Sequence, residues 1–255
     1  MRRLFALALG ATLLLALALP AAYFVLQRDL PPLFTRDEIV HTLKIYVEGQ
    51  RQQAFAGVNV GMVEPFTALG PKDLGQPLLD GALAVQGCPD YFTSEKEAGA
   101  AWLMRVVQFG SGLGFGGAGP GNCELQFADR LAGALGLPGD AKRALAVHEI
   151  HEGLSKRELL DLELSSRYFA PGILGVRSAS KRLMGKEPGA LSIAEAAELL
   201  LAEREYARVL DCRNPTLLRI ARNNVIEQMA AFALIKRAAA EKAKTERLHC
   251  LSRPG

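Results

Sequence analysis

Apolar residues recur every three to four positions along most of the chain, which is typical of amphipathic helices. Between residues 39 and 47, four apolar side chains share one helical face behind a capping box formed by Thr35 and Glu38. Other helix starts are predicted from their capping residues: Ser155 with Glu158, Ser192 with Glu195, and Asn214 before Pro215. Turns between helices are expected at glycines: Gly172, Gly175 and Gly185. Ser94 with Glu97 predicts a helix through Val107, and one long helix is expected from Thr216 to the end.

An apolar run from Leu4 to Leu26 follows Met1, Arg2 and Arg3. This length suits a helix that spans a bilayer, and the arginines would keep the N-terminus in the cytoplasm. We therefore expect a membrane anchor over residues 1–27, a proline-containing linker over 28–34 and a periplasmic domain over 35–250. A cleaved signal peptide is the alternative, since small residues at 16–22 could serve a peptidase.

Composition supports a mainly α fold. The 255 residues are 49% hydrophobic, and alanine and leucine dominate. A formal net charge of +3 is too small to indicate a nucleic-acid partner. It would suit a domain beside anionic lipid heads.

The order of residues between 154 and 229 is more specific. It resembles glycosyltransferase family 51, the membrane-bound peptidoglycan glycosyltransferases (biosynthetic transglycosylases). The first matching positions are Ser155, Lys156, Glu158, Leu159, Leu160, Tyr168, Phe169, Gly172, Gly175, Val176, Ala179 and Ser180. The series continues with Gly185, Lys186, Leu191, Glu195, Ala196, Ala197, Leu199, Leu200, Asn214, Pro215, Arg222, Val225, Ile226 and Met229.

This resemblance implies a lysozyme-like, two-lobed helical domain behind a single transmembrane helix. It also implies a place in the bacterial inner membrane with the domain in the periplasm. The ligand of such a domain would be a lipid-linked sugar diphosphate, and its partners would be wall-synthesis or secretion proteins.

Both glutamates that the family uses for catalysis are missing. The first, a general base, falls on Gln86 or on Cys88, depending on the anchor chosen for the alignment. The second falls on Arg143. An amide cannot accept a proton near neutral pH, so Gln86 cannot replace the base. Asp90 and Glu95 are the neighbouring acids that could take its place.

The remaining polar positions suggest where a substrate would bind. The candidates are Gln126, Lys142, Arg143 and Lys156. His148 and Glu152, four residues apart on a predicted helix, could hold a metal, but a solvated helix face explains the His/Glu-rich segment better. We expect no cofactor, and a divalent metal as in the family only if the domain is active.

Cys88, Cys123, Cys212 and Cys250 allow three pairings in an oxidising compartment, and free buried thiols are the alternative. In the resembled fold, the segments that hold Cys88 and Cys123 face each other across the cleft. The resemblance therefore implies a Cys88–Cys123 bridge, with Cys212 and Cys250 as the second pair.

The sequence thus predicts a degenerate peptidoglycan glycosyltransferase-like domain with weak or absent glycan polymerisation, a pseudoenzyme. An active glycosyltransferase that uses Asp90 or Glu95 is one alternative. A wall-cleaving enzyme is another, although no cleft acid for that reaction can be identified.

Overall fold

The computed structural model of the protein describes residues 25, 27, 28, 30–33, 35–54, 66–70, 72–96, 123–137, 140–170, 173–210 and 214–249. Helices make up most of it, which confirms the mainly α prediction. The elements are α2 (Arg36–Ala54), α3 (Gln76–Gln86), α5 (Cys123–Ala134), α6 (Asp140–Gly153), α7 (Lys156–Ser166), β1 (Tyr168–Ala170), β2 (Ile173–Leu174), α8 (Gly175–Ala179), the π-helix η2 (Ser180–Met184), the 3₁₀ helix η3 (Pro188–Ala190), α9 (Ile193–Leu210), α10 (Pro215–Ala231) and α11 (Arg237–Thr245).

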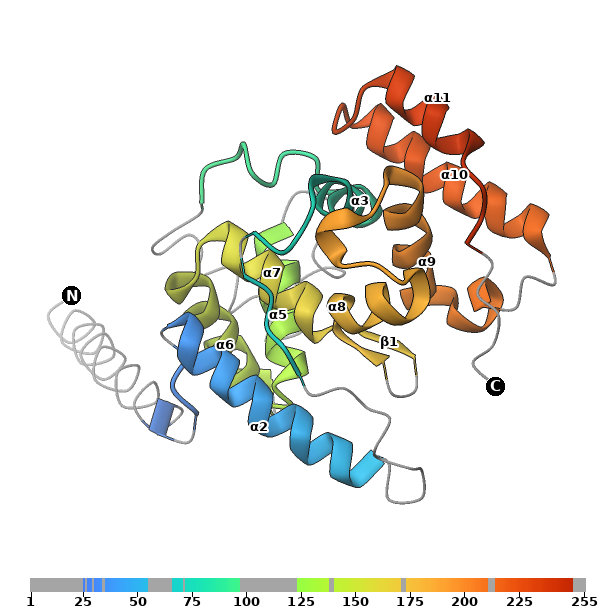
Figure 1. The fold of residues 1–255 in the computed structure, drawn as a ribbon. Helices are drawn as coiled ribbons and strands as arrows, with labels where there is room; N and C mark the ends of the chain where they lie inside the picture. Colours follow the sequence, from blue (N-terminus) through green and yellow to red (C-terminus); the bar gives the residue numbers. More distant parts are fainter. Residues whose placement is uncertain are drawn as a thin grey trace, which may run out of the picture.

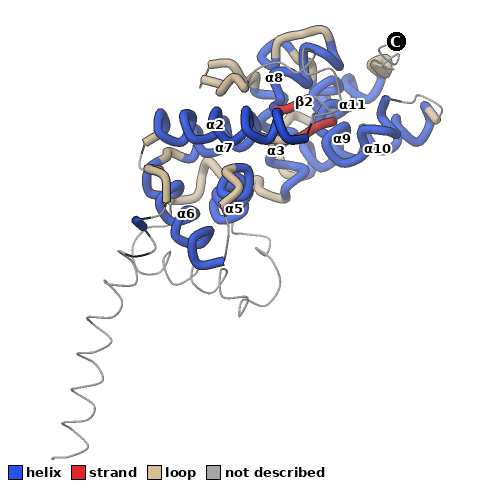
Figure 2. The backbone as a smooth tube through the Cα atoms, turned by 90° about the horizontal axis from the view of Figure 1, so that it is seen from below, coloured by secondary structure: helices blue, strands red, loops and turns tan. Residues whose placement is uncertain are grey.

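These elements form two groups of packed helices (Figure 1). In the first, α5 packs against both α6 and α7, and α2 contacts α7. In the second, α3, α9 and α10 pack on one another, and α11 lies on α10. Helix α8 and the short antiparallel pair of β1 and β2 lie between them, with α8 against α7 and β1 against α9. Figure 2 shows the same arrangement from below.

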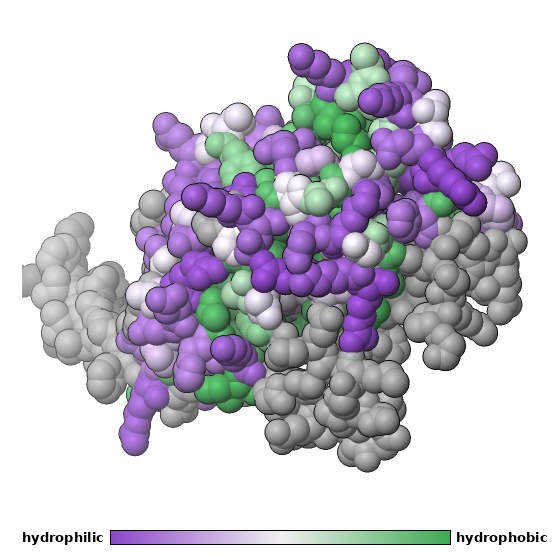
Figure 3. All heavy atoms as spheres, in the orientation of Figure 1, coloured by the Kyte–Doolittle hydropathy of each residue, from purple (hydrophilic) through white to green (hydrophobic). Residues whose placement is uncertain are grey.

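The apolar core is continuous through both groups. Its main cluster takes fully buried leucines from most elements, among them Leu43, Leu79, Leu131, Leu160 and Leu199. A smaller cluster between α3, α9, α10 and α11 is built mostly from alanines and from Ile226 and Met229. The surface seen in Figure 3 is largely hydrophilic, and hydrophobic side chains show most continuously near the α10–α11 end.

The predicted helix starts are present as hydrogen bonds. The Ser155 hydroxyl accepts from the Glu158 amide at 3.3 Å, and the Ser155 amide donates to the Glu158 carboxylate at 3.0 Å. Ser192 and Glu195 form the same reciprocal pair, and the Asn214 side chain accepts from the Leu217 amide. Gly175 begins α8 and Gly185 ends η2, whereas Gly172 and the segment 97–107 lie outside the described residues.

The prediction of one long helix from Thr216 onwards was wrong. Helix α10 ends at Ala231, the chain turns with Ala233 at a φ of 56°, and α11 begins at Arg237. The turn folds α11 back onto α10, which buries Ala240 and Ala243 against the smaller cluster. A straight helix would leave both exposed.

The helix around His148 and Glu152, for which a solvated face was predicted, also carries buried charged and polar side chains. On α6, Glu149 and His151 are buried, at 4% and 0% exposure, because α6 lies along α5. The Glu152 side chain is about half exposed, at 47%, and His148 is half-buried, so these two residues do face solvent in part.

None of the helices that the structure describes is long and apolar enough to cross a bilayer. The apolar run Leu4–Leu26 falls almost wholly outside the described residues, so the anchor, the linker and the domain boundary stay predictions.

Candidate functional site

The end of α3 and the segment after it hold Gln86 and Cys88, the two positions that the resemblance aligns with the general base. Gln86 is the last residue of α3, and Gly87 ends the helix with a φ of 69°. Cys88 comes next and is 1% exposed. Its sulfur is bonded to Cys123, the first residue of α5, with 5.9 Å between the two Cα atoms. The predicted Cys88–Cys123 pairing is therefore present, and Cys212 and Cys250 lie outside the described residues.

The residue after Cys123 is a buried carboxylate that sequence reasoning missed. Glu124 is 7% exposed and meets the fully buried His151 ring, with 2.6 Å between Oε2 and Nε2. Its other oxygen, Oε1, lies 2.7 Å from the Nζ of Lys156. Burial by itself would raise the pKa of the Glu124 carboxyl, but the hydrogen bonds and charges of His151 and Lys156 outweigh burial and lower the pKa. Glu124 is therefore held ionised.

Lys156 is turned inward rather than offered to a ligand. Besides Glu124, its Nζ donates to the main-chain oxygens of Tyr91 and Ser94 at 2.8 and 2.7 Å, and to the Ser94 hydroxyl at 2.8 Å. The Tyr91 hydroxyl donates back to the Lys156 carbonyl at 2.8 Å. Burial, and then the charges of Glu124 and two further acids, raise the pKa of Tyr91. Lys156 thus fastens the segment 88–96 to the start of α7.

The other candidate substrate-binding residues lie further along α5 and α6. Arg143 on α6 forms a bidentate pair with Asp129 of α5, at 2.6 and 2.8 Å. Asp129 is five residues, or about 7.5 Å, along the helix from Glu124, where Lys156 binds. The two cations therefore contact different parts of α5. Lys142 and Gln126 are half-buried on α6 and α5.

A second buried charge network joins α7 to α9. The Nε of Arg167 lies 2.9 Å from both oxygens of Glu163, and its Nη1 lies 2.6 Å from Glu203. Arg130 of α5 pairs with Glu163 at 3.3 Å, and its guanidinium lies over the Phe127 ring, 5.3 Å from the centroid. Glu163 therefore carries a buried charge that two arginines compensate.

The two acids proposed for a displaced base are both exposed. Asp90 and Glu95 lie in the turns between Cys88 and Lys96. The buried Asp80 of α3 accepts a hydrogen bond from the Gln76 amide at 2.6 Å. The buried carboxylates that meet cations in this region are Glu124, Asp161 and Glu163. The cationic partners of Glu124 and Glu163 are described above, and Asp161 pairs with Arg157 at 3.0 Å.

These partners also decide whether a divalent metal fits. Each oxygen of Glu124 already meets His151 or Lys156, and Glu163 is held by two arginines. In the described part of the chain, no group of three or more His, Cys, Asp or Glu side chains is suited to hold a metal ion. The described residues of this region therefore do not fit the divalent metal that the resemblance implies.

Periodicity could have revealed the missed pair. On α5, Glu124 shares the buried stripe with Ala128 and Leu131, and on α6, His151 lies between Val147 and Leu154 at helical spacing. A titratable residue inside an apolar stripe is either paired or costly. Two such residues on neighbouring helices are therefore candidates for a buried pair.

Comparison with known proteins gives one partial match. A stretch of 93 residues is 36% identical to penicillin-binding protein 1C of Escherichia coli (strain K12). It covers 36% of this chain and only 12% of that protein. No protein-family model matches the sequence. The similarity supports a distant relationship to a penicillin-binding protein over about a third of the chain.

Proposed function

We propose that this chain is a membrane-anchored, peptidoglycan glycosyltransferase-like domain that acts in bacterial cell-wall assembly and polymerises glycan weakly or not at all. The motifs between residues 154 and 229 and the partial similarity to penicillin-binding protein 1C support the wall-related role. The proposal includes a lysozyme-like two-lobed domain, held by one N-terminal span in the inner membrane and facing the periplasm.

The observation that carries the proposal is the Cys88–Cys123 bridge. A general base needs a carboxylate or imidazole within reach of the proton that it removes. One register of the family alignment puts a disulfide sulfur at that position, and the other puts the Gln86 amide there. Disulfides persist in oxidising compartments, which agrees with a periplasmic location.

The second glutamate position supports the same conclusion. Arg143 stands there, and its guanidinium is engaged by Asp129. General acid–base catalysis typically contributes 10²- to 10⁴-fold to a rate, so losing the base lowers polymerisation by orders of magnitude. What remains is weak binding of a lipid-linked sugar diphosphate, and a scaffold for wall-synthesis or secretion proteins.

An assay with purified lipid-linked disaccharide tests the proposal. The full-length protein in detergent or nanodiscs is incubated with the substrate, beside an active family member as positive control, and glycan chains are separated by gel. We expect no chains from this protein under conditions in which the control converts all substrate. Processive chains at rates comparable to the control would overturn the proposal.

The same assay tests the alternative, in which the protein is active and Asp90 or Glu95 is the general base. If chains do form, the variants Asp90→Ala and Glu95→Ala decide whether either acid is the base. If one variant made no product but kept the circular dichroism spectrum of the wild type, the protein would be an active glycosyltransferase with that acid as its base.

A further inference from the structure

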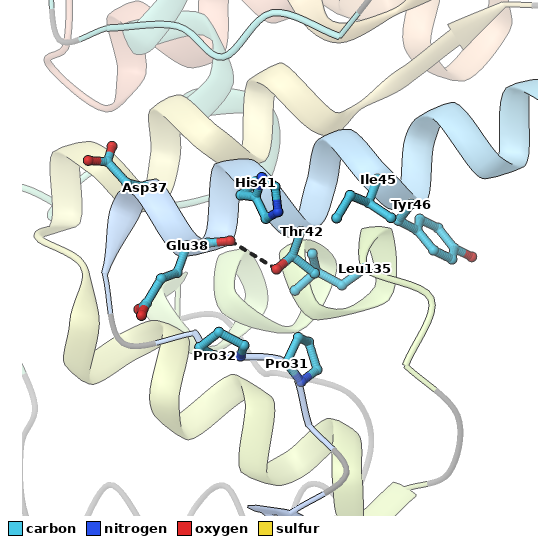
Figure 4. A pocket seen from close by; sticks show the side chains of 9 residues that line it. All are labelled: Pro31, Pro32, Asp37, Glu38, His41, Thr42, Ile45, Tyr46 and Leu135. Atoms are coloured by element: carbon cyan, nitrogen blue, oxygen red, sulfur yellow. Dashed lines mark hydrogen bonds between the residues drawn. The ribbon is translucent and has the colours of Figure 1, made fainter.

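A preformed apolar groove lies between the chain that leads into α2, the α2 helix itself and the end of α5. It has a volume of about 600 Å³, and its apolar walls are Pro31, Pro32, Ile45, Tyr46 and Leu135. Figure 4 shows the two prolines facing α2 from below, with Leu135 drawn between them and α2, beside Thr42. The groove follows α2 from residue 37 to residue 46, which is roughly 14 Å along the helix axis.

Two of the polar residues at this groove, Thr42 and Glu38, have hydrogen-bond partners within the protein, and the exposed His41 also lines it. The Thr42 hydroxyl donates to the Glu38 carbonyl at 2.9 Å, the bond drawn in Figure 4. The Glu38 carboxylate accepts from the amide and the hydroxyl of Thr35, each at 2.9 Å. In Figure 4 the Asp37 carboxylate points away from the prolines. The groove therefore presents mainly apolar surface, with His41 as an exposed polar side chain on the α2 wall.

Buried contacts hold the walls in place. Leu33, directly after the prolines, is 0% exposed, as are Ile39 and Leu43 on the opposite face of α2. The Tyr46 ring lies directly against Gly136, so that a Cβ at that position would overlap it. In contrast, Ile45 is 62% exposed, although it is a large apolar side chain. An exposed apolar side chain beside an apolar hollow is a candidate contact for a partner or a membrane.

The position of the groove along the chain indicates what covers it. Pro31 comes five residues after Leu26, the end of the apolar run, so their Cα atoms are at most about 18 Å apart. Gln27, the first residue after the run, donates from its side chain to Glu149 of α6 at 3.3 Å. The few residues between the run and the groove are too short a spacer to hold the groove far from a bilayer that the run would cross.

We propose that this groove docks on the membrane surface and takes an acyl chain of a bilayer phospholipid. The inference rests on the membrane anchor of the proposed function, but not on whether the domain polymerises glycan. A slot of apolar walls suits a hydrocarbon chain, and a tyrosine at its rim suits the boundary between hydrocarbon and headgroups.

Photocrosslinking tests this placement. The photoreactive residue p-benzoylphenylalanine replaces Ile45 in the full-length protein, which is reconstituted into vesicles of phosphatidylethanolamine and phosphatidylglycerol. The matched control carries the same residue in place of Leu217 on α10, which is also 62% exposed. After irradiation we expect phospholipid adducts at position 45, at least tenfold above the level at position 217, detected by mass spectrometry of the intact protein.

Each other outcome overturns the inference in a recognisable way. Adducts between two protein copies at position 45 would assign the groove to a protein partner. Equal lipid adducts at both positions, or none at either while the protein resists alkaline carbonate extraction, would show an anchored protein whose groove holds no lipid. Release by carbonate would show that the anchor itself is absent, and this result is independent of the glycan assay.

Discussion

Lys156 has its ammonium group bound inside the protein, between Glu124 and the main-chain oxygens of Tyr91 and Ser94. The side chain of Lys156 is 12% exposed, and the side chain of Glu124, taken without its backbone, is 9% exposed. Removing one member of such a pair leaves the other charge buried and poorly compensated, which is more costly than the pair itself is stabilising. The contacts of Lys156 therefore support a structural role rather than a role in binding substrate.

We predict that Lys156→Met lowers the free energy of unfolding by about 3 kcal/mol, measured by urea denaturation. The control is Lys181→Met, because Lys181 pairs with Glu187 at 2.8 Å but both side chains are roughly half exposed. That variant should change stability by less than about 0.5 kcal/mol. Equal losses in the two variants would contradict the buried network.

Asp161 gives the fold a pH dependence of its own. Its side chain is fully buried, and burial raises its pKa to about 6, although the charge and hydrogen bond of Arg157 act in the opposite direction. In the unfolded chain the same carboxyl titrates near 3.8. Between these values the folded protein binds a proton that the unfolded chain has released. The stability contributed by this group is therefore complete below about pH 4 and is lost as the pH rises through 6.

We predict that Asp161→Asn removes this slope. The difference in unfolding free energy between wild type and variant should change by on the order of 3 kcal/mol between pH 4 and pH 7, in the sense that the wild type loses stability as the pH rises. Urea denaturation of both proteins at several pH values measures it. Parallel pH profiles would contradict the assignment to Asp161.

At the scale of elements, α2 is joined to the turn after α5 by the ring of Tyr46, which packs on Gly136. Gly136 follows α5 with a φ of 64°, and the Tyr46 ring lies where its side chain would be. Gly185, at the end of η2, has a similar φ of 68° but no atom within 4 Å of the position of a Cβ. The two glycines therefore separate the effect of backbone conformation from that of close packing.

We predict that Gly185→Ala costs about 1 kcal/mol, the strain of a left-handed backbone, and that Gly136→Ala costs roughly 2 to 4 kcal/mol because overpacking adds to that strain. Thermal and urea unfolding of both variants measure the difference. Combining Gly136→Ala with Tyr46→Ala should recover part of the loss. Equal losses of stability in the two single variants would contradict the close packing of Tyr46 on Gly136.

Elements could be predicted from the sequence where their cause is local. The starts of α7, α9 and α10 follow from Ser155, Ser192 and Asn214, because a capping side chain acts within three residues. The turn at Ala233 could not be predicted, since neither glycine nor proline marks it and its cause is the return of α11 to the core.

The candidate site divides in the same way. The Cys88–Cys123 pairing could be expected because the resemblance supplied the spatial neighbours of both residues. The Glu124–His151 contact joins residues 27 positions apart on different helices, so it depends on how α5 and α6 pack. Sequence patterns show that both residues lie on buried stripes, but the register of two helices is needed to bring them together.

For the whole molecule, the Cys88–Cys123 bridge fixes the end of α3 to the start of α5, across a sequence separation of 35 residues. Lys156 and Tyr91 hold the same segment to α7 without a covalent bond. A cross-link over a loop of this length contributes roughly 3 to 4 kcal/mol, mainly by restricting the unfolded chain. The bridge thus stabilises the fold at a position that the resemblance aligns with a catalytic group of the family.

We predict that the double variant Cys88→Ser and Cys123→Ser loses roughly 3 to 4 kcal/mol relative to the oxidised wild type, measured by urea denaturation. Non-reducing peptide mapping of the wild type should recover the peptides of residues 88 and 123 as one linked species. Polymerisation of lipid-linked disaccharide should stay absent in the double variant, because opening the bridge restores no carboxylate at position 86 or 88. Free thiols at both cysteines, or glycan chains made by the double variant alone, would show instead that the bridge is a reversible lock on an active site.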